Sequence, residues 1–244
     1  MEEAQASDRN SEFQKGFSMT DLNSRFTHDQ ITVMEEFRKS FIGAKRIMTY
    51  YNCAMLEAET KFKVLNYQFS LEQDRNPIET IKTRLKSFDS ISEKLIRRGL
   101  PLTVESLQAN LYDVAGVRVI CPFVDDIYTI AECFLSQDDV TLIRASDYIK
   151  RPKENGYRSL HLIVEIPIFL QNEKRLMPVE VQLRTIAMDF WASLEHKMHY
   201  KKDIPESIAD ELREELRECA DGISALDSRM GELRKRIEDS RSDL

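Results

Sequence analysis

The chain lacks several features that would assign it to a common class. No apolar run approaches the roughly 20 residues that a membrane span requires, and the first residues have neither the basic nor the apolar part of a secretory signal. The four cysteines are scattered without a C-x-x-C pair, which argues against a structural zinc and is typical of reduced thiols. The formal net charge of −7 argues against non-specific binding to nucleic acid or membranes. We therefore expect a cytoplasmic protein that needs neither a membrane nor a nucleic acid.

Glycine is also scarce, and the G-x-x-x-x-G-K-[ST] loop that cradles phosphates is absent, so any phosphate must be recognised by side chains. A length of 244 residues suits one sizeable domain with helical extensions. We expect a tail over 1–27 that need not be ordered, a helical segment over 28–76, a central domain over 77–204 and a C-terminal helix over 205–244. The pattern does not show whether the first helical segment is one helix or two.

The stretch Pro178–Arg184 alternates strictly and predicts a strand with two different faces. Its apolar positions are Val179, Val181 and Leu183, and its polar positions are Glu180, Gln182 and Arg184. A solvated sheet face gives the same alternation, so this strand alone leaves a site and a plain surface equally open.

A helix is predicted over about Ile78–Arg98, because its residues separate into two faces at the helical period. The apolar face has Ile81, Leu85, Phe88 and Leu95, whereas Lys86, Ser90, Lys94 and Arg97 lie opposite, with Arg84 on one flank. A solvated basic face is the plainer reading of this pattern, and an anion-binding row is the alternative.

A buried strand is predicted after Asp113, where a β-branched run extends to Pro122. The carboxylate stands at the entrance of this strand, where it can face a cleft, and Gly116 permits close approach of a backbone or ligand. A helix over 125–135 and a strand over 140–144 follow, so the order β-α-β indicates a mixed sheet.

A basic turn over 150–161 feeds the next strand, where Tyr157, Ser159 and His161 are expected to share one face. A ring, a hydroxyl and an imidazole together suit stacking of a base and binding of sugar or phosphate. The helix after Thr185 is expected to carry Asp189 and further charged residues on its surface. Its pair His196 and His199 could bind a metal, but no third ligand has suitable spacing.

The last segment has a heptad seam, formed by Leu216, Cys219, Ile223, Leu226, Met230, Leu233 and Ile237. Such a seam can pack on its own domain or on another subunit. Its length exceeds what a compact sheet would cover, so we expect it to be buried between subunits.

Three ordered motifs together resemble the synthetase domain of the bacterial RelA/SpoT family, and most closely its stand-alone small alarmone synthetases of the RelP-like branch. They are Asp113-x-x-Gly116-x-Arg118, Gly156-Tyr157-Arg158-Ser159-x-His161 and Val179-Glu180-Val181-Gln182-x-Arg184-Thr185. The likeness covers about Pro77–Lys202. It implies an α+β fold of the nucleotidyltransferase-like kind, with a mixed sheet of about five strands, flanking helices and long terminal helices.

The resemblance also implies the activity of a GTP pyrophosphokinase in the stringent response. Such an enzyme transfers the β,γ-pyrophosphate of ATP to the 3′-hydroxyl of GTP or GDP, which gives (p)ppGpp and AMP. By the same likeness Asp113 and Glu180 would be the catalytic residues and hold Mg²⁺. ATP would be bound by Arg84, Lys86, Ser90, Lys94, Arg97 and Arg118, with Arg84 and Arg118 around the adenine. GTP or GDP would be bound by Lys153, Tyr157, His161, Gln182, Arg184 and Asp189, of which Asp189 stands where some relatives have Asn.

The relatives further imply a homo-oligomer, a homotetramer formed through terminal helices. With only four histidines and one His-Asp pair, we expect synthesis without the hydrolase activity of the long family members. Two other functions remain alternatives: a nucleotidyltransferase that transfers a nucleoside monophosphate, and a non-catalytic helical scaffold.

Overall fold

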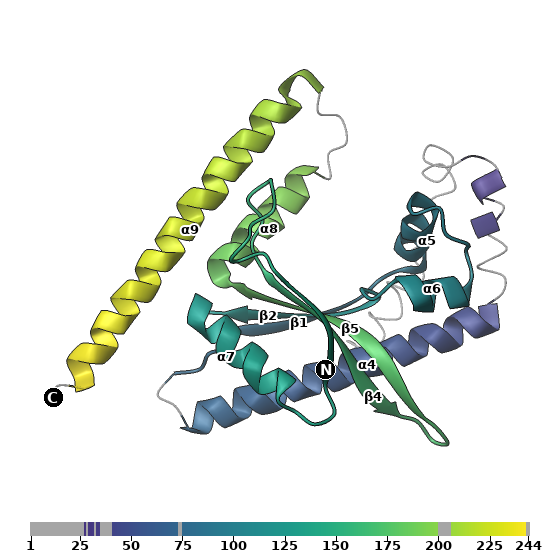
Figure 1. Cartoon of the computed structure of the whole chain (residues 1–244), viewed down its shortest axis with the longest axis horizontal. Coiled ribbons are helices and arrows are strands. Elements are labelled where there is room, and N and C mark those ends of the chain that lie inside the picture. The colour runs from purple at the N-terminus through teal and green to yellow at the C-terminus, as the bar shows by residue number, and fades with distance from the viewer. Residues whose placement is uncertain are drawn as a thin grey trace, which may run out of the picture.

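The computed structural model describes residues 27, 29–31, 33–34, 41–72, 75–199 and 206–242. Their helices are α4 (Phe41–Glu72), α5 (Phe88–Arg97), α6 (Val104–Asn110), α7 (Val124–Leu135), α8 (Ile186–His199) and α9 (Glu206–Ser242). Their strands are β1 (Thr80–Leu85), β2 (Ala115–Cys121), β3 (Thr141–Asp147), β4 (Leu160–Phe169) and β5 (Lys174–Thr185), as Figure 1 shows. The predicted tail over 1–27 lies almost entirely outside the described residues. The α+β class, the mixed sheet and the two long terminal helices are confirmed.

The five strands form one sheet in the order β1-β2-β5-β4-β3. Neighbouring strands are antiparallel except for the central pair β2 and β5, which is parallel. The alternation predicted for β5 is confirmed, because Val179, Val181 and Leu183 are fully buried. This apolar face turns towards the core, so the polar positions of β5 must face the other side.

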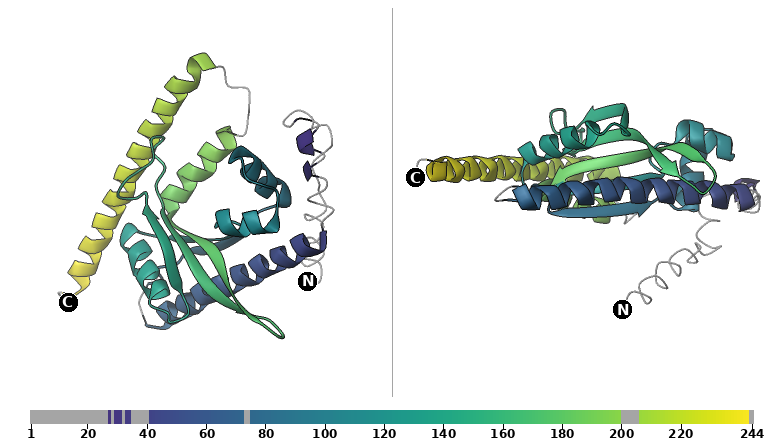
Figure 2. Two further views of the ribbon diagram at one scale, coloured as in Figure 1. Left: turned by 45° about the vertical axis from the view of Figure 1, so that its right-hand side comes forward. Right: turned by 90° about the horizontal axis from the view of Figure 1, so that it is seen from below.

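One continuous helix, α4, runs along the apolar face of the sheet (Figures 1 and 2). Within the helical segment predicted over 28–76, residues 41–72 are therefore a single helix. Ala54 and Ala58 are fully buried, and their small side chains let the helix approach the strands closely. In the second half of the helix, Phe62 stacks on Phe134 of α7, with ring centroids 4.4 Å apart. These rings join α4, α7 and the sheet into one core.

The helix predicted over Ile78–Arg98 is wrong in its first part, because Thr80–Leu85 is the edge strand β1. This strand pairs antiparallel with β2, and its apolar positions Ile81 and Leu85, four apart, satisfy both the helical and the strand period. The helix begins only at Phe88, where the side chain of Ser87 accepts a hydrogen bond from the backbone of Ser90. Lys86 therefore lies between strand and helix instead of on one helical row with Lys94.

The long helix α9 lies beside α8, across the molecule from α5 (Figures 1 and 2). It turns Ala220 and Asp227 towards its own domain, where both are buried. Its C-terminal half is held by Arg234, which donates to Asp125 of α7 at 3.0 Å. The outward positions of the heptad seam are exposed in the chain, at 61% for Leu226, 51% for Met230, 41% for Leu233 and 55% for Ile237. The N-terminal part of the seam packs on the domain, where Leu216 and Ile223 contact the cluster around Trp191. Only the positions from Leu226 to Ile237 face away from it.

All four cysteines are free thiols in the structure. Along the residues that the structure describes, no helix combines the length and the apolar character needed to cross a membrane.

The Phe62 ring is the clearest test of this core. We expect Phe62→Ala to lower the free energy of unfolding by about 3 to 5 kcal/mol, because it leaves a cavity against Phe134. The matched control is Tyr67→Ala on the same helix, where the side chain is 73% exposed and the loss should stay within about 0.5 kcal/mol. Urea unfolding followed by circular dichroism measures both. Equal losses would show that α4 does not form the core through Phe62.

Candidate functional site

The polar side of the sheet brings together side chains from four strands. In the register of the strands, Arg118 of β2 lies between Lys82 of β1 and Gln182 of β5. Gln182 in turn lies opposite His161 of β4. One row of the sheet therefore carries two cations, an amide and an imidazole. The residues are up to 100 positions apart in sequence, and only the strand order makes them neighbours.

Beside this row, Glu180 lies next to a position without a side chain. Its neighbour across the parallel pair is Gly116, which in turn pairs with Arg84 of β1. A Cβ at Gly116 would lie 3.4 Å from the backbone oxygen of Arg84 and 3.9 Å from that of Glu180. Because Gly116 has no side chain, the surface of the sheet between Arg84 of β1 and Glu180 of β5 is not covered by a side chain at this position. We call this position the open floor at Gly116, and the sequence suggested it.

Asp113 stands at the entrance of β2 and is paired with two lysines. Its Oδ2 accepts hydrogen bonds from the Nζ atoms of Lys86 and of Lys94, the latter at 2.5 Å. Burial alone would raise the pKa of this carboxyl, but the two ammonium groups outweigh it and hold the pKa below its ordinary value. Burial also lowers the pKa of Lys86, against the opposing effect of Asp113. Within the described residues Asp113 Oδ1 is buried and has no hydrogen-bond partner.

Glu180 is connected along its own strand to an arginine. Its Oε2 accepts from the Gln182 amide at 2.9 Å, and the Gln182 oxygen accepts from Arg184 at 2.9 Å. The Nδ1 atom of His161 lies 3.4 Å from Glu180 Oε1. Burial would raise the pKa of Glu180, but His161 and Gln182 outweigh it and keep the pKa below its ordinary value. The carboxylate is therefore ionised at neutral pH and able to accept a proton.

Aromatic rings form the wall beside β4. The Tyr157 hydroxyl lies 2.8 Å from His161 Nε2 and accepts a hydrogen bond from Arg184 at 2.5 Å. Tyr148 packs edge-on against both rings, with centroids 6.1 Å from Tyr157 and 5.3 Å from His161. The Lys153 ammonium lies 4.7 Å from the Tyr148 centroid and 4.8 Å from the Tyr157 centroid. This wall offers ring faces and a cation to a planar, anionic ligand.

Asp189 was predicted on the surface of α8, and this is wrong. Its side chain is buried and accepts from Lys82 at 3.0 Å, Arg118 at 3.2 Å and Arg184 at 3.3 Å. The helix begins directly after β5, so its first turn points back over the polar face of the sheet. Three cations that would repel one another are held together by this one carboxylate.

Ser159 was predicted to share the site face with Tyr157, and this is also wrong. It precedes β4, is fully buried, and donates to the backbone oxygen of Leu183 at 3.1 Å. Of the other residues predicted to bind ATP, Arg84 and Arg97 are exposed, and the backbone of Ser90 donates to the Ser87 side chain at the start of α5. The sequence reasoning missed Lys82 and Tyr148. Lys82 alternates with Arg84 on β1, so recognition of that strand would have placed both on the polar face.

No group of three His, Cys, Asp or Glu side chains is arranged to hold a metal ion among the described residues. The site offers two carboxylates, that of Asp113 just before β2 and that of Glu180 on the neighbouring strand β5. Any metal ion here would therefore take part of its coordination from water or from a bound substrate.

Comparisons with known proteins agree with this geometry. The family described as "Region found in RelA / SpoT proteins" matches residues 83–205. The chain is 40% identical over 220 residues to GTP pyrophosphokinase YwaC of Bacillus subtilis (strain 168), which covers 89% of this chain and all of that protein. It is 37% identical over 201 residues to GTP pyrophosphokinase YjbM of the same organism, across 81% of this chain and 92% of that one.

Solved structures give the same relationship. Small alarmone synthetase 1 from Bacillus subtilis, bound to its product pppGpp, superposes with a TM-score of 0.73 at 36% identity, over 80% of this chain and 98% of that one. Small alarmone synthetase 2 from the same organism gives a TM-score of 0.70 at 41% identity, over 79% and 98%. Both likenesses cover more of the chain than the family match over residues 83–205.

Asp189 provides a test of the electrostatics of this face. Asp189→Ala should lower the free energy of unfolding by about 3 to 5 kcal/mol, because buried Arg184 loses its counter-ion. The pair with Lys82 adds little, since that side chain is 54% exposed. Asp189→Asn keeps an acceptor and should lose less. Exposed Asp138→Ala is the control, and a loss no larger than that of Asp138→Ala would contradict this role for Asp189.

Proposed function

The chain belongs to the RelA/SpoT family as a small alarmone synthetase that makes (p)ppGpp, and we propose that the polar face of its sheet is the synthetase site. The observation that carries the proposal is the placement of Asp113 and Glu180 beside the open floor at Gly116, between cations on one flank and aromatic rings on the other. Two ionised carboxylates, a phosphate-binding flank and a base-binding flank are the parts that pyrophosphoryl transfer between two nucleotides needs.

The donor side is formed by β1, α5 and β2. We assign ATP to Arg84, Lys86, Ser90, Lys94, Arg97 and Arg118. Lys86 and Lys94 converge on one oxygen of Asp113, so their positive charge is already gathered where the triphosphate would lie. Arg118 donates through Nη1 to Asp189 at 3.2 Å, while its Nε is buried without a hydrogen-bond partner in the described part of the chain.

The acceptor side is formed by β4, β5 and the loop before β4. We assign GTP or GDP to Lys153, Tyr157, His161, Gln182, Arg184 and Asp189. The Tyr157 ring suits stacking on guanine, and Lys153 supplies charge for the acceptor phosphates. The burial of Asp189 supports a role in holding Arg184 and Arg118 in place rather than an exposed contact with the base.

The carboxylate oxygens of this site suit the coordination of a magnesium ion. Asp113 Oδ1 is a buried carboxylate oxygen without a partner among the described residues, and Glu180 lies beside the open floor at Gly116. Carboxylate oxygens are the hard ligands that Mg²⁺ prefers. We propose that Asp113 and Glu180 would hold Mg²⁺, which neutralises charge on the donor phosphates when bound.

The reaction joins the 3′-oxygen of the acceptor to the β-phosphorus of ATP and breaks the bond from that phosphorus to the bridging oxygen of AMP. Glu180 accepts the proton of the 3′-hydroxyl, since its lowered pKa keeps it ionised at neutral pH. Lys86 and Lys94 offset the negative charge of the phosphates, while Tyr157 orients the acceptor. A nucleotidyltransferase would instead attack the α-phosphorus and release pyrophosphate, and a scaffold would release nothing.

Product analysis with ATP, GTP or GDP and Mg²⁺ tests the proposal. We expect AMP and a 3′-pyrophosphorylated guanosine nucleotide, with turnover lowered about 100- to 1,000-fold in Asp113→Asn and in Glu180→Gln. Asp138→Asn and Glu132→Gln are matched exposed controls that should keep full activity. Release of pyrophosphate would favour nucleotidyl transfer, and full activity in a folded Asp113 or Glu180 variant would remove that residue from the mechanism.

We further propose that α9 assembles subunits into a homotetramer, the state that the family resemblance of the sequence implied. The exposure of Leu226, Met230, Leu233 and Ile237 supports this, because a continuous apolar stripe of that length is unusual on a monomer. In this proposal residues 77–204 are the synthetase domain and 205–244 the association helix.

Charge placed on the outward part of the seam tests the assembly. Leu226→Glu with Met230→Glu should release smaller species in light scattering coupled to gel filtration, because both side chains are exposed in the single chain. Ile223 is a poorer choice, since it packs on Trp191 of its own domain. Ala225→Glu with Ser228→Glu adds the same charge to exposed positions away from the seam and should keep the native mass. An unaltered protein that is already monomeric at micromolar concentration would refute the proposal.

A further inference from the structure

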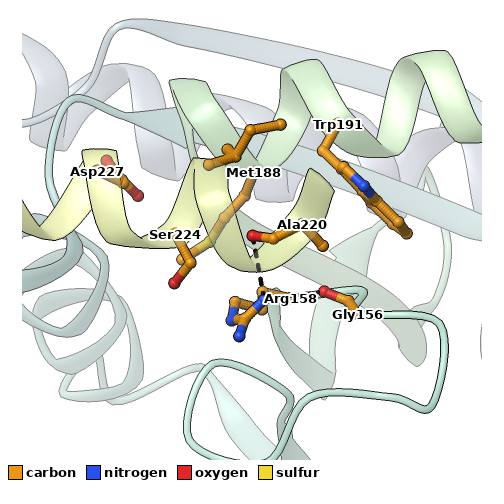
Figure 3. Close-up of a pocket in the computed structure, with 8 residues that line it drawn as sticks. Gly156, Arg158, Met188, Trp191, Ala220, Ser224 and Asp227 are labelled. Carbon is orange, nitrogen blue, oxygen red and sulfur yellow. Dashed lines mark hydrogen bonds between the residues drawn. The ribbon is translucent and has the colours of Figure 1, made fainter. Parts of the chain in front are cut away.

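The loop that carries Tyr157 rests directly on the backbone of α9. Gly156 has a φ of +84°, and a Cβ added there would lie 2.5 Å from the Cβ of Ala220 and 3.4 Å from the Cα of Arg217. Figure 3 shows Gly156 facing Ala220 across this contact. Two real Cβ atoms do not approach so closely, so only a glycine opposite a small residue permits this packing.

Arg158, on the other side of Tyr157, fastens the same loop to the helix. Its Nη1 donates to the backbone oxygens of Gly156 at 3.2 Å and Ala220 at 3.4 Å, and Figure 3 shows Arg158 against Ala220. Its Nη2 donates to the Asp221 carboxylate at 2.9 Å. The Arg158 side chain is only 17% exposed. Both residues that flank the proposed guanine-stacking ring are therefore fixed by α9.

The end of β5 is fastened to α9 as well. Thr185, which follows Arg184, donates through Oγ1 to Asp227 at 2.6 Å. Trp191 of α8 donates through Nε1 to the backbone oxygen of Leu216 at 3.0 Å. The space left between these contacts is about 20 Å³, which admits at most a water molecule. The helix thus supports the loop and the strand end directly, with no room for a ligand between them.

We infer that residues 216–227 of α9 are part of the acceptor site, and that Gly156, Arg158 and Ala220 are positioning residues for Tyr157 and Arg184. The inference rests on the proposed function, because it concerns the guanosine nucleotide of that reaction. The donor side belongs to β1, α5 and the entrance of β2, and none of these elements lines this contact. Disturbing the contact should therefore weaken the acceptor and spare ATP.

A double-mutant cycle across the contact separates helix packing from backbone strain. Gly156→Ala suffers from both its positive φ and the clash with Ala220, whereas Gly156→Ala with Ala220→Gly keeps the strain and removes the clash. We expect Gly156→Ala to weaken GDP binding at least about tenfold, and the double variant to recover most of that loss. Calorimetric titration with GDP alone measures this without turnover. No recovery in the double variant would overturn the inference.

Ala220→Val approaches the same contact from the helix. It should raise the KM for GTP about tenfold while the KM for ATP and the kcat change less than about twofold. Ala225→Val is the matched control, because it adds the same side chain to an exposed position of α9. Trp191 is the only tryptophan in the chain, so its fluorescence reports whether α9 stays docked in each variant. Equal losses for both nucleotides, or undocking of α9 with unchanged GDP affinity, would overturn the inference.

The outcomes also separate this inference from the proposed function. If the unaltered protein binds no GDP and forms no AMP, the acceptor site and its support by α9 both fail. If the unaltered protein is active and GDP binding is unchanged in Ala220→Val, only the role of α9 fails.

Discussion

The parallel pairing of β2 with β5 is the constraint on which the rest of the site depends. It places Gly116 beside Glu180 and Arg118 beside Gln182, so the entrance of one strand and the polar face of the other share one surface. A shift of a single residue would turn Glu180 towards the core and Val181 towards the site, because neighbouring side chains on a strand point to opposite faces. Fully buried Val179 and Val181, packed above α4, make such a shift costly. The apolar core thus fixes the register that brings the two carboxylates together.

On the same surface, the cationic side chains are already held in place by carboxylates when no ligand is bound. Asp113 gathers Lys86 and Lys94, and Asp189 gathers cations from three strands. Mutual repulsion would otherwise spread these cations into solvent, where they would be screened. In the proposed reaction, the phosphates of ATP would replace part of the interaction of these lysines with Asp113. The charged side chains therefore keep their positions when no substrate is bound. They need little rearrangement when substrate binds.

Helix α9 connects this site to the outer surface of the molecule. One face carries Ala220 and Asp227 against the Gly156 loop and the end of β5, and another carries the exposed C-terminal part of the seam, from Leu226 to Ile237. A helix is stiff along its length, so a displacement at the seam is also a displacement of the surface on which Gly156 rests. If subunits associate through the seam, the acceptor loop and the assembly share one rigid element.

The sequence by itself determined the features that depend on local pattern. Strict alternation predicted β5 and its two faces, a β-branched run predicted β2 with Asp113 at its entrance, and heptad spacing predicted an apolar seam on the last helix. Tertiary structure alone decided what depends on partners distant in sequence. Ile81 and Leu85 suit a helix or a strand, and pairing with β2 selected the strand. Asp189 was buried because three cations from other elements surround it, and Ser159 because β5 supplied its acceptor. Likewise, no local pattern could show that Gly156 meets Ala220, since that contact exists only after the sheet has set where α8 and α9 lie.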